Sequence, residues 1–444
     1  AMTEAEAADS RLRSWLRRAG RPANYGKKYG SLPEEEDDIA VGSIAPEEAG
    51  RVGGVMKMAR KCRKIICTVF GAVVCLAGIT LLAYVYIAVS PDDLAFVTIG
   101  DWGCGPENCL VPPQAPAGYH HGAQNTKNVA QSMAQTAKNI GSKFVLALGD
   151  NFYFRGVESA SDPLWKSVWE KQFDYASLHT PWYAILGNHD HYGNPEAQID
   201  FSRKHLDCKE FEHCPARWVM PRYWYSVVHP SARKRFDVQF VFIDTVILAE
   251  ASSKAMAEEK ARLGMLNKAD MARWEAWSKE QELMGRLQLE WLEQTLNAST
   301  ADWLIVAGHY PVYSGGEHGD TPELQHRVKP LLEKYNVDAY LCGHDHTLQM
   351  LESNGVHYFV SGSGSFHGQY SPKGESLFGT VECGFMAHRI MPSRMDVSII
   401  DQHGKTLYRS FIPRKRNRNR GGVGELAGVK KEFQMDADKV YKIF

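Results

Sequence analysis

Short segments that join a glycine to a potential metal ligand recur along this chain of 444 residues. The stretch Leu341–His346 reads Leu-Cys-Gly-His-Asp-His and places two histidines two residues apart after an apolar run. Imidazole nitrogen binds iron and zinc, and neutral histidine keeps this capacity at physiological pH. One such motif is weak evidence for a metal site. Four further segments of this design lie upstream, beginning at Gly100, Gly149, Gly187 and Gly308.

The ligand types in these segments indicate two metal ions rather than one. They are two carboxylates, one phenol, one amide oxygen and three imidazoles, from Asp101, Asp150, Tyr153, Asn188, His309, His344 and His346. A mononuclear zinc site uses three or four protein groups, whereas seven suit a pair of metals that share a carboxylate. Phenolate favours a trivalent ion, and amide oxygen favours a divalent one. The set therefore predicts ferric iron beside a divalent partner.

Each ligand segment follows an apolar run that predicts a buried strand. The five runs are residues 94–99, 143–148, 182–186, 303–307 and 339–342. Ligand sites in α/β sheets lie beyond the carboxyl ends of strands, and glycine permits a sharp turn there. Each segment alone could be an ordinary helix-capping turn. Together, the five predict one site that is built from distant parts of the chain.

Strands and helices alternate through most of the sequence. Further strands are predicted at 238–243, 357–361, 385–390, 396–400 and 406–411, and helices at 125–140, 164–173, 255–296 and 323–335. The alternation predicts an α/β fold, and the strand-rich end predicts a second sheet packed on the first.

The chain resembles the purple acid phosphatases of the small, tartrate-resistant type, within the calcineurin-like metallophosphoesterase superfamily. The resemblance covers about residues 94–414 and rests on motifs at 148–154, 187–191, 307–312 and 340–346. It implies a four-layer αββα sandwich of two mixed sheets. It also implies that ferric iron is bound by Asp101, Tyr153 and His346. A divalent iron, zinc or manganese ion would be bound by Asn188, His309 and His344, with Asp150 bridging the two metals.

Two further histidines fit catalysis. His189 directly follows the ligand Asn188, and His318 lies nine residues after His309 in a glycine-containing loop. Alone, His318 would be taken for a surface histidine, but the resemblance implies that both histidines contact substrate phosphate. Two bound cations would make hydroxide available below neutral pH for in-line attack on a phosphomonoester, and either histidine would protonate the leaving alcohol. An acidic pH optimum is expected, because the histidine must be protonated to donate.

The first ninety residues carry a separate signal. Ile65–Val89 contains 25 residues without a charge, which is long enough to cross a bilayer as a helix. Four basic residues at 60–64 precede it, and this bias keeps the N-terminus cytosolic, or on the matrix side of an organelle. A buried core helix is the alternative. We therefore predict a single-pass membrane protein with a mostly flexible arm at 1–64 and a transmembrane helix at 65–89. A luminal or extracellular phosphoesterase domain at 94–412 and a basic, solvated tail at 413–444 would follow.

Cysteine spacing agrees with an oxidising compartment. Cys104 and Cys109 lie five residues apart, and Cys208 and Cys214 lie six apart, so local disulfides are expected, with free thiols or zinc ligands as the alternative. Asn297-Ala298-Ser299 is a glycosylation acceptor on the same side of the membrane. The net charge of -1 gives no reason to expect nucleic-acid binding.

Two segments depart from the family pattern. Residues 104–124 form an insertion just beyond the first ligand, and residues 250–282 replace a loop that covers the site in relatives with a longer, helical segment. The helical region at 250–296 and the N-terminal arm could bind partners in a membrane complex. An accessory subunit that uses a phosphatase-derived domain is therefore the alternative function, and hydrolysis of phosphodiesters is a third possibility.

Overall fold

The computed structural model describes residues 46–89, 92–109, 120–206, 217–249, 258, 261, 268–415 and 434–436. The chain divides into two compact units, Ala1–Ser90 and Pro91–Phe444. In the first unit, helix α2 (Pro46–Val89) is continuous over 44 residues. The predicted transmembrane segment at 65–89 lies within it. Among the residues that the structure describes, no helix combines the length and the apolar character needed to cross a membrane.

The second unit contains two mixed β-sheets. The first sheet has the order β14-β13-β12-β1-β2-β3-β4. Its strands are β1 (Leu94–Ile99), β2 (Val145–Leu148), β3 (Trp182–Ile185), β4 (Trp218–Val219), β12 (Gly384–Ile390), β13 (Arg394–Asp401) and β14 (Thr406–Pro413). Strands β1 to β4 pair in parallel, whereas β12 pairs antiparallel with β1. The carboxyl ends of β1, β2 and β3 therefore lie at one edge of this sheet.

The second sheet has the order β11-β9-β10-β8-β7-β6-β5-β15. Its strands are β5 (Tyr225–Pro230), β6 (Asp237–Phe242), β7 (Trp303–Ala307), β8 (Ala339–Cys342), β9 (Leu348–Ser353), β10 (Val356–Ser361), β11 (Ser376–Thr380) and β15 (Gln434–Asp436). Strands β6, β7, β8 and β10 pair in parallel. Strand β15 pairs in parallel with β5, so this part of the predicted solvated tail is an edge strand instead.

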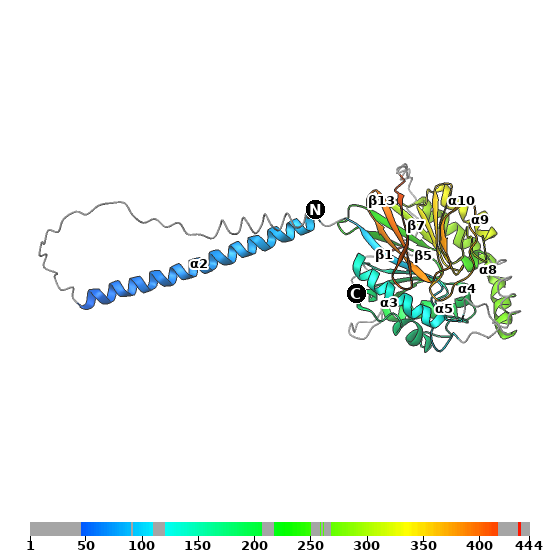
Figure 1. Cartoon of the computed structure of the whole chain (residues 1–444), viewed down its shortest axis with the longest axis horizontal. Helices are drawn as coiled ribbons and strands as arrows, with labels where there is room; N and C mark the ends of the chain where they lie inside the picture. Colours follow the sequence, from blue (N-terminus) through cyan, green and yellow to red (C-terminus); the bar gives the residue numbers. More distant parts are fainter. Residues whose placement is uncertain are drawn as a thin grey trace, which may run out of the picture. The chain divides into compact units, whose positions relative to one another are not determined.

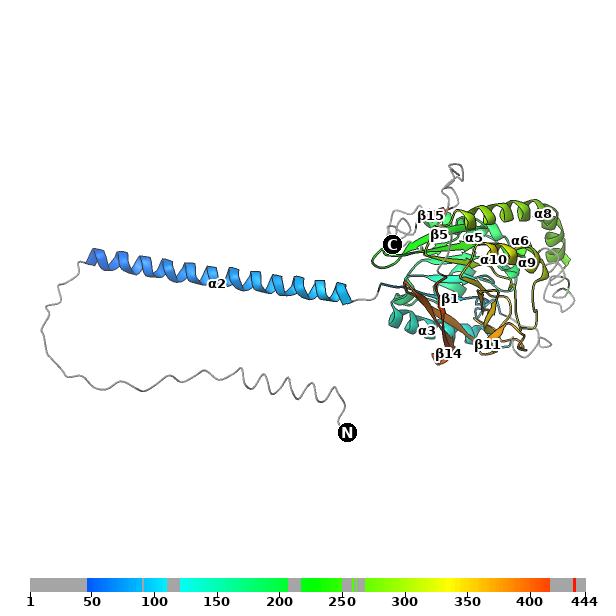
Figure 2. The same cartoon turned by 90° about the horizontal axis from the view of Figure 1, so that it is seen from above.

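The two sheets face each other with helices on their outer sides (Figures 1 and 2). Aromatic side chains fill the space between the sheets, where the ring of Phe96 lies 5.1 Å from that of Phe144 and 5.2 Å from that of Phe240. Helix α3 (Gly122–Ile140) packs on β1 and β12. The outer side of the second sheet is covered by α6 (Thr245–Leu248), α8 (Lys268–Asn297), α9 (Pro322–Arg327) and α10 (Lys329–Lys334). The expected α/β arrangement of two mixed sheets with helices is confirmed.

Three shorter helices lie near the connections of the first sheet. They are α4 (Asn188–His191), α5 (Pro195–Leu206) and a turn of 3₁₀ helix at Ala176–Leu178. The helix expected at 164–173 is a short π-helix, Trp165–Glu170. The long helix expected at 255–296 is described as α8 from Lys268 onward, and residues 250–257 lie outside the described part.

Candidate metal centre

The predicted ligand segments meet where the parallel strands of both sheets end. Asp101, Asp150 and Asn188 follow β1, β2 and β3, whereas His309 and His344 follow β7 and β8 of the other sheet. All seven predicted ligands are buried, with His344 the most exposed at 6%. The site is therefore enclosed by two sheet edges that face each other.

The three residues predicted for ferric iron lie within contact distance of one another. The phenol oxygen of Tyr153 is 3.1 Å from Oδ1 of Asp101 and 3.1 Å from Nε2 of His346. Nε2 of His346 is 3.5 Å from the same carboxylate oxygen. A phenol, a carboxylate and an imidazole thus converge on one point.

The residues predicted for the divalent ion form an adjoining group. Nε2 of His309 lies 3.2 Å from Oδ1 of Asn188 and 3.5 Å from Oδ1 of Asp150. The rings of His309 and His344 have their centres 5.2 Å apart. Ligand atoms of Asp101, Asp150 and His309 all lie within 4.8 Å of one another, which joins the two groups. Asp150 therefore lies close to both groups.

Backbone contacts orient these side chains. The Nδ1 of His309 is 2.8 Å from the carbonyl oxygen of Leu148, so a proton on Nδ1 leaves Nε2 directed at the site with a free lone pair. The amide of His344 donates to Oδ2 of Asp101 at 2.7 Å, and the amide of His189 donates to Oδ1 of Asp150 at 2.9 Å. These amide contacts fix the orientation of both carboxylates.

Two of the glycines are required because neighbouring side chains approach their Cα atoms closely, and not because their backbone is left-handed. A Cβ atom on Gly187 would lie 2.2 Å from Oδ1 of Asp150, and one on Gly343 would lie 2.4 Å from Oδ2 of Asp101. Left-handed φ angles are instead adopted by the ligands Asp101 (56°), Asp150 (50°) and His344 (72°). Such angles are uncommon outside glycine and cluster at functional sites.

The charges of the site fit a cation. Burial raises the pKa of Asp101 well above its usual value, with Asp150 adding to the effect and His309 opposing it. The ion pairs seen for these two carboxylates within the described residues are with histidines. Two buried carboxylates at close range repel each other unless a proton or a cation lies between them. The donor set, which mixes carboxylates, a phenol, an amide and imidazoles, therefore suits a pair of metal ions.

The two predicted catalytic histidines border this group. The Nδ1 of His189 is 2.8 Å from the carbonyl oxygen of Phe154, and its Nε2 is 3.9 Å from Oδ2 of Asp150. The ring of His318 stacks on that of His344 with their centres 4.5 Å apart, and its side chain is 18% exposed. His318 is thus the more accessible of the two.

Two buried aspartates were missed by the sequence analysis. Asp190 accepts hydrogen bonds from the amides of Gly187 at 2.8 Å and Asn151 at 3.1 Å, and so joins two ligand segments. Burial and the nearby Asp150 raise the pKa of Asp190 to about 7. Asp345 accepts from the amide of His318 at 2.8 Å. Both aspartates lie between two histidines in a His-Asp-His segment. A charged residue at such a position, directly after a buried strand, was the feature that could have identified them.

Comparisons with known proteins agree with the site. The calcineurin-like phosphoesterase family matches residues 94–348, and the chain belongs to this family. Tartrate-resistant acid phosphatase type 5 of Mus musculus is 36% identical over 334 residues, which cover 72% of this chain and 91% of the relative. Purple acid phosphatase 4 of Arabidopsis thaliana is 30% identical over 336 residues, covering 74% and 86%. Within its family, the chain is a purple acid phosphatase-like phosphoesterase.

A solved structure supports the fold. GAP50, the anchor in the inner membrane complex of Plasmodium, superposes with a TM-score of 0.56 at 24% identity, over 73% of this chain and 90% of that one. The predicted resemblance to the purple acid phosphatases is confirmed by the family match and by the relatives at 30–36% identity. The binuclear centre of ferric iron and a second metal that this resemblance implies is consistent with the buried cluster of Asp101, Asp150 and His309.

Proposed function

We propose that this protein is a binuclear-metal acid phosphatase that hydrolyses phosphomonoesters on the non-cytosolic side of a membrane. The observation that carries the hydrolytic part is the contact of the Tyr153 phenol with Asp101 and His346, beside the Asp150–His309 pair. This arrangement supports ferric iron at Tyr153 and a divalent iron, zinc or manganese ion at His309.

The residues of the chain have separate tasks in this reaction. Bound metal ions would supply charge neutralisation for the phosphate and hydroxide below neutral pH. His189 is fixed by its bond to Phe154 and lies next to the bridging carboxylate, where it would orient phosphate. His318 is fixed through its backbone to Asp345 and is partly exposed, where it would protonate the departing alcohol.

The test is activity of the purified chain on p-nitrophenyl phosphate and on its bis ester. We expect hydrolysis of the monoester at acidic pH and slower hydrolysis of the diester. Asp150→Asn should abolish hydrolysis of the monoester, because the shared carboxylate loses its charge. The control is Asp396→Asn, which changes an aspartate 39% exposed in an ion pair with Arg394. A wild-type protein that prefers the diester, or an active Asp150→Asn protein, would contradict the proposal.

Membrane anchoring through 65–89 is the second part of the proposal, and it rests on the sequence, since no helix among the described residues meets the length and apolar character of a membrane span. It is supported by the 25 uncharged residues and the preceding basic cluster. In helix α2, Ile66, Phe70 and Leu76 are between 66% and 70% exposed, which leaves large apolar side chains uncovered. Extraction of membranes at alkaline pH tests this part. Retention in the membrane pellet, with Asn297 glycosylated, is expected; release into the supernatant contradicts it.

The accessory-subunit alternative is not favoured. The relatives reported above are named as phosphatases, and each predicted ligand position of this chain carries a metal-binding side chain. Purification distinguishes the two functions, because a free, active protein supports the enzyme and co-isolation of an inactive chain in a large complex supports the subunit.

A further inference from the structure

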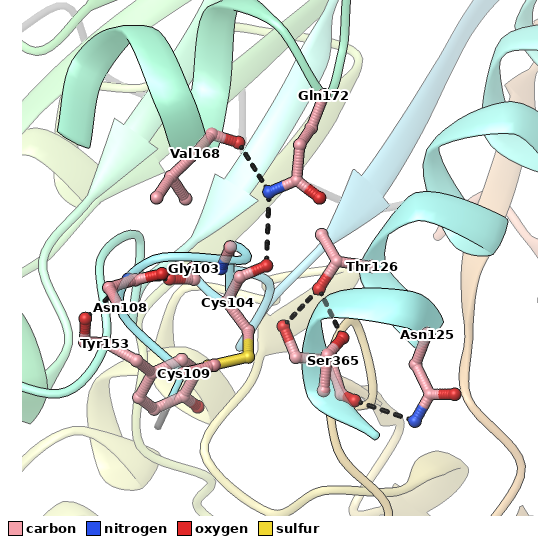
Figure 3. Close-up of a disulfide and its surroundings, with 12 residues drawn as sticks. Gly103, Cys104, Asn108, Cys109, Asn125, Thr126, Tyr153, Val168, Gln172 and Ser365 are labelled. Carbon is pink, nitrogen blue, oxygen red and sulfur yellow. Dashed lines mark hydrogen bonds between the residues drawn. A yellow bond between two sulfur atoms is a disulfide. The ribbon is translucent and has the colours of Figure 1, made fainter. Parts of the chain in front are cut away.

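The loop that follows the first ligand segment is closed by a disulfide between Cys104 and Cys109. The sequence analysis identified this region as an insertion with no assigned role. Cys104 is buried and belongs to a small apolar cluster with Tyr153 and Phe366. Figure 3 shows the disulfide beside Tyr153, with Asn108 directed at the backbone of both segments. The loop therefore borders the tyrosine that is predicted to bind iron.

Asn108 joins this loop to Tyr153 through its side-chain amide. Its Nδ2 donates to the carbonyl oxygen of Tyr153 at 2.6 Å and to that of Gly103 at 2.8 Å. Its Oδ1 accepts from the amide of Gly105 at 2.6 Å. Both amide hydrogens and the acceptor of Asn108 are thus used, two of the bonds lying within the loop and one reaching Tyr153.

The backbone of Tyr153 is held on both sides. Its amide donates to the carbonyl oxygen of Gly103 at 3.0 Å, and its own carbonyl oxygen accepts from Asn108. Its ring packs against Phe366 with their centres 4.9 Å apart, so the phenol has little freedom to turn. Because Asp101 begins the same loop, one set of contacts fixes two predicted ligands whose oxygens lie 3.1 Å apart.

We propose that Asn108, held in place by the Cys104–Cys109 disulfide, is a positioning residue for Tyr153. This inference rests on the proposed function in taking Tyr153 as an iron ligand. The disulfide closes a loop across five residues and limits the positions open to Asn108. Gln172 supports the same loop by donating to the carbonyl oxygen of Cys104 at 3.1 Å. Groups that orient a metal ligand typically change metal affinity or activity about 10–100-fold when they are altered.

Two variants test the proposal. Asn108→Asp keeps the size of the side chain and the acceptor for Gly105, but removes both donors to the carbonyl groups. Cys104→Ala/Cys109→Ala opens the loop without a thiol reductant, which would also reduce ferric iron. The matched control is Asn194→Asp, because Asn194 donates to the carbonyl oxygen of Glu158 at 3.2 Å, outside the Tyr153 cluster.

Two readouts are used besides activity. We expect both variants to raise the dissociation constant for iron about 10–100-fold and to shift the visible absorption band, with the control unchanged. In metal-free protein, amide hydrogen exchange of the peptide around Tyr153 should become about two- to tenfold faster, as expected for the loss of one hydrogen bond. Circular dichroism of each variant should match the wild type.

The outcomes separate the parts of the proposal. Wild-type iron affinity and exchange in Asn108→Asp would overturn the positioning role. If only the double cysteine variant keeps the iron affinity and the hydrogen exchange of the wild type, the role of the disulfide is overturned. If the wild-type protein binds no iron, the proposed function fails, and the exchange measurement on metal-free protein still decides whether Asn108 holds Tyr153.

Discussion

We predict that the buried His388 makes the free energy of unfolding decrease as the pH falls. Its ring is fully buried, stacked on Phe96 with their centres 4.7 Å apart, and its Nε2 is 3.2 Å from the hydroxyl of Thr98. Its Nδ1 has no hydrogen-bond partner among the described residues. Protonation would place an unpaired charge in the core. Burial accordingly lowers the pKa of His388 from 6.5 to about 3.

The sign and size of the effect follow from the two pKa values. The unfolded chain takes up a proton on His388 below pH 6.5, whereas the folded chain does not until about pH 3. The free energy of unfolding therefore contains the full contribution above pH 6.5 and loses it as the pH falls. One pH unit corresponds to about 1.4 kcal/mol, so this residue should lower the stability by about 2 kcal/mol at pH 5.

The assay is urea unfolding of metal-free wild type and His388→Gln at pH 7.5 and pH 5. The glutamine variant should be less stable at pH 7.5 by about 1–3 kcal/mol, because the stacked ring is lost. Its further loss between the two pH values should be about 2 kcal/mol smaller than that of the wild type. His403→Gln, at an exposed position, should behave as the wild type. Equal losses in wild type and His388→Gln would refute the reasoning.

Three further predictions concern the site. Tyr153→Phe should abolish any purple colour, because tyrosinate-to-iron charge transfer produces it; a variant that still absorbs in the visible contradicts the assignment of this ligand. His318→Asn should lower kcat about 10²–10⁴-fold on an alkyl phosphate and less on p-nitrophenyl phosphate, whose leaving group needs less protonation; equal losses on the two substrates argue against a general acid. Gly187→Ala should reduce the metal content and the melting temperature, since its Cβ would lie 2.2 Å from Asp150. The control Gly374→Ala has open space around the new methyl group and should change neither quantity. Wild-type metal content in Gly187→Ala would exclude close approach as the role of this glycine.

Much of the fold could be predicted because the strands that carry ligands can be recognised from their own residues and the glycine that follows them. Runs such as Leu94–Ile99 and Trp303–Ala307 are apolar except for Thr98, since they are buried on both faces, and the glycine after each marks its end. Strand β9 (Leu348–Ser353) was not predicted. It begins two residues after His346, and its sequence mixes polar and apolar residues without a clear period.

The contacts that support the ligands could not be predicted in the same way. Asp190 bonds to Asn151, 39 residues away, and Asn108 bonds to Tyr153, 45 residues away. Such partners depend on how loops meet after the sheets have packed, and the residue types alone do not specify this. The resemblance to a family supplied the ligand set, but not the residues in the insertion at 104–124. The individual roles of the predicted ligands stay predictions.

Anomalous X-ray scattering from crystals of the purified protein tests the metal centre most directly. Data at the iron absorption edge should show one peak in contact with the phenol oxygen of Tyr153. A second metal should lie about 3.5–4 Å away, next to His309, with Asp150 between the two. A site that holds one metal ion only, or metal density remote from Tyr153 and Asp150, would contradict the binuclear centre and with it the proposed reaction.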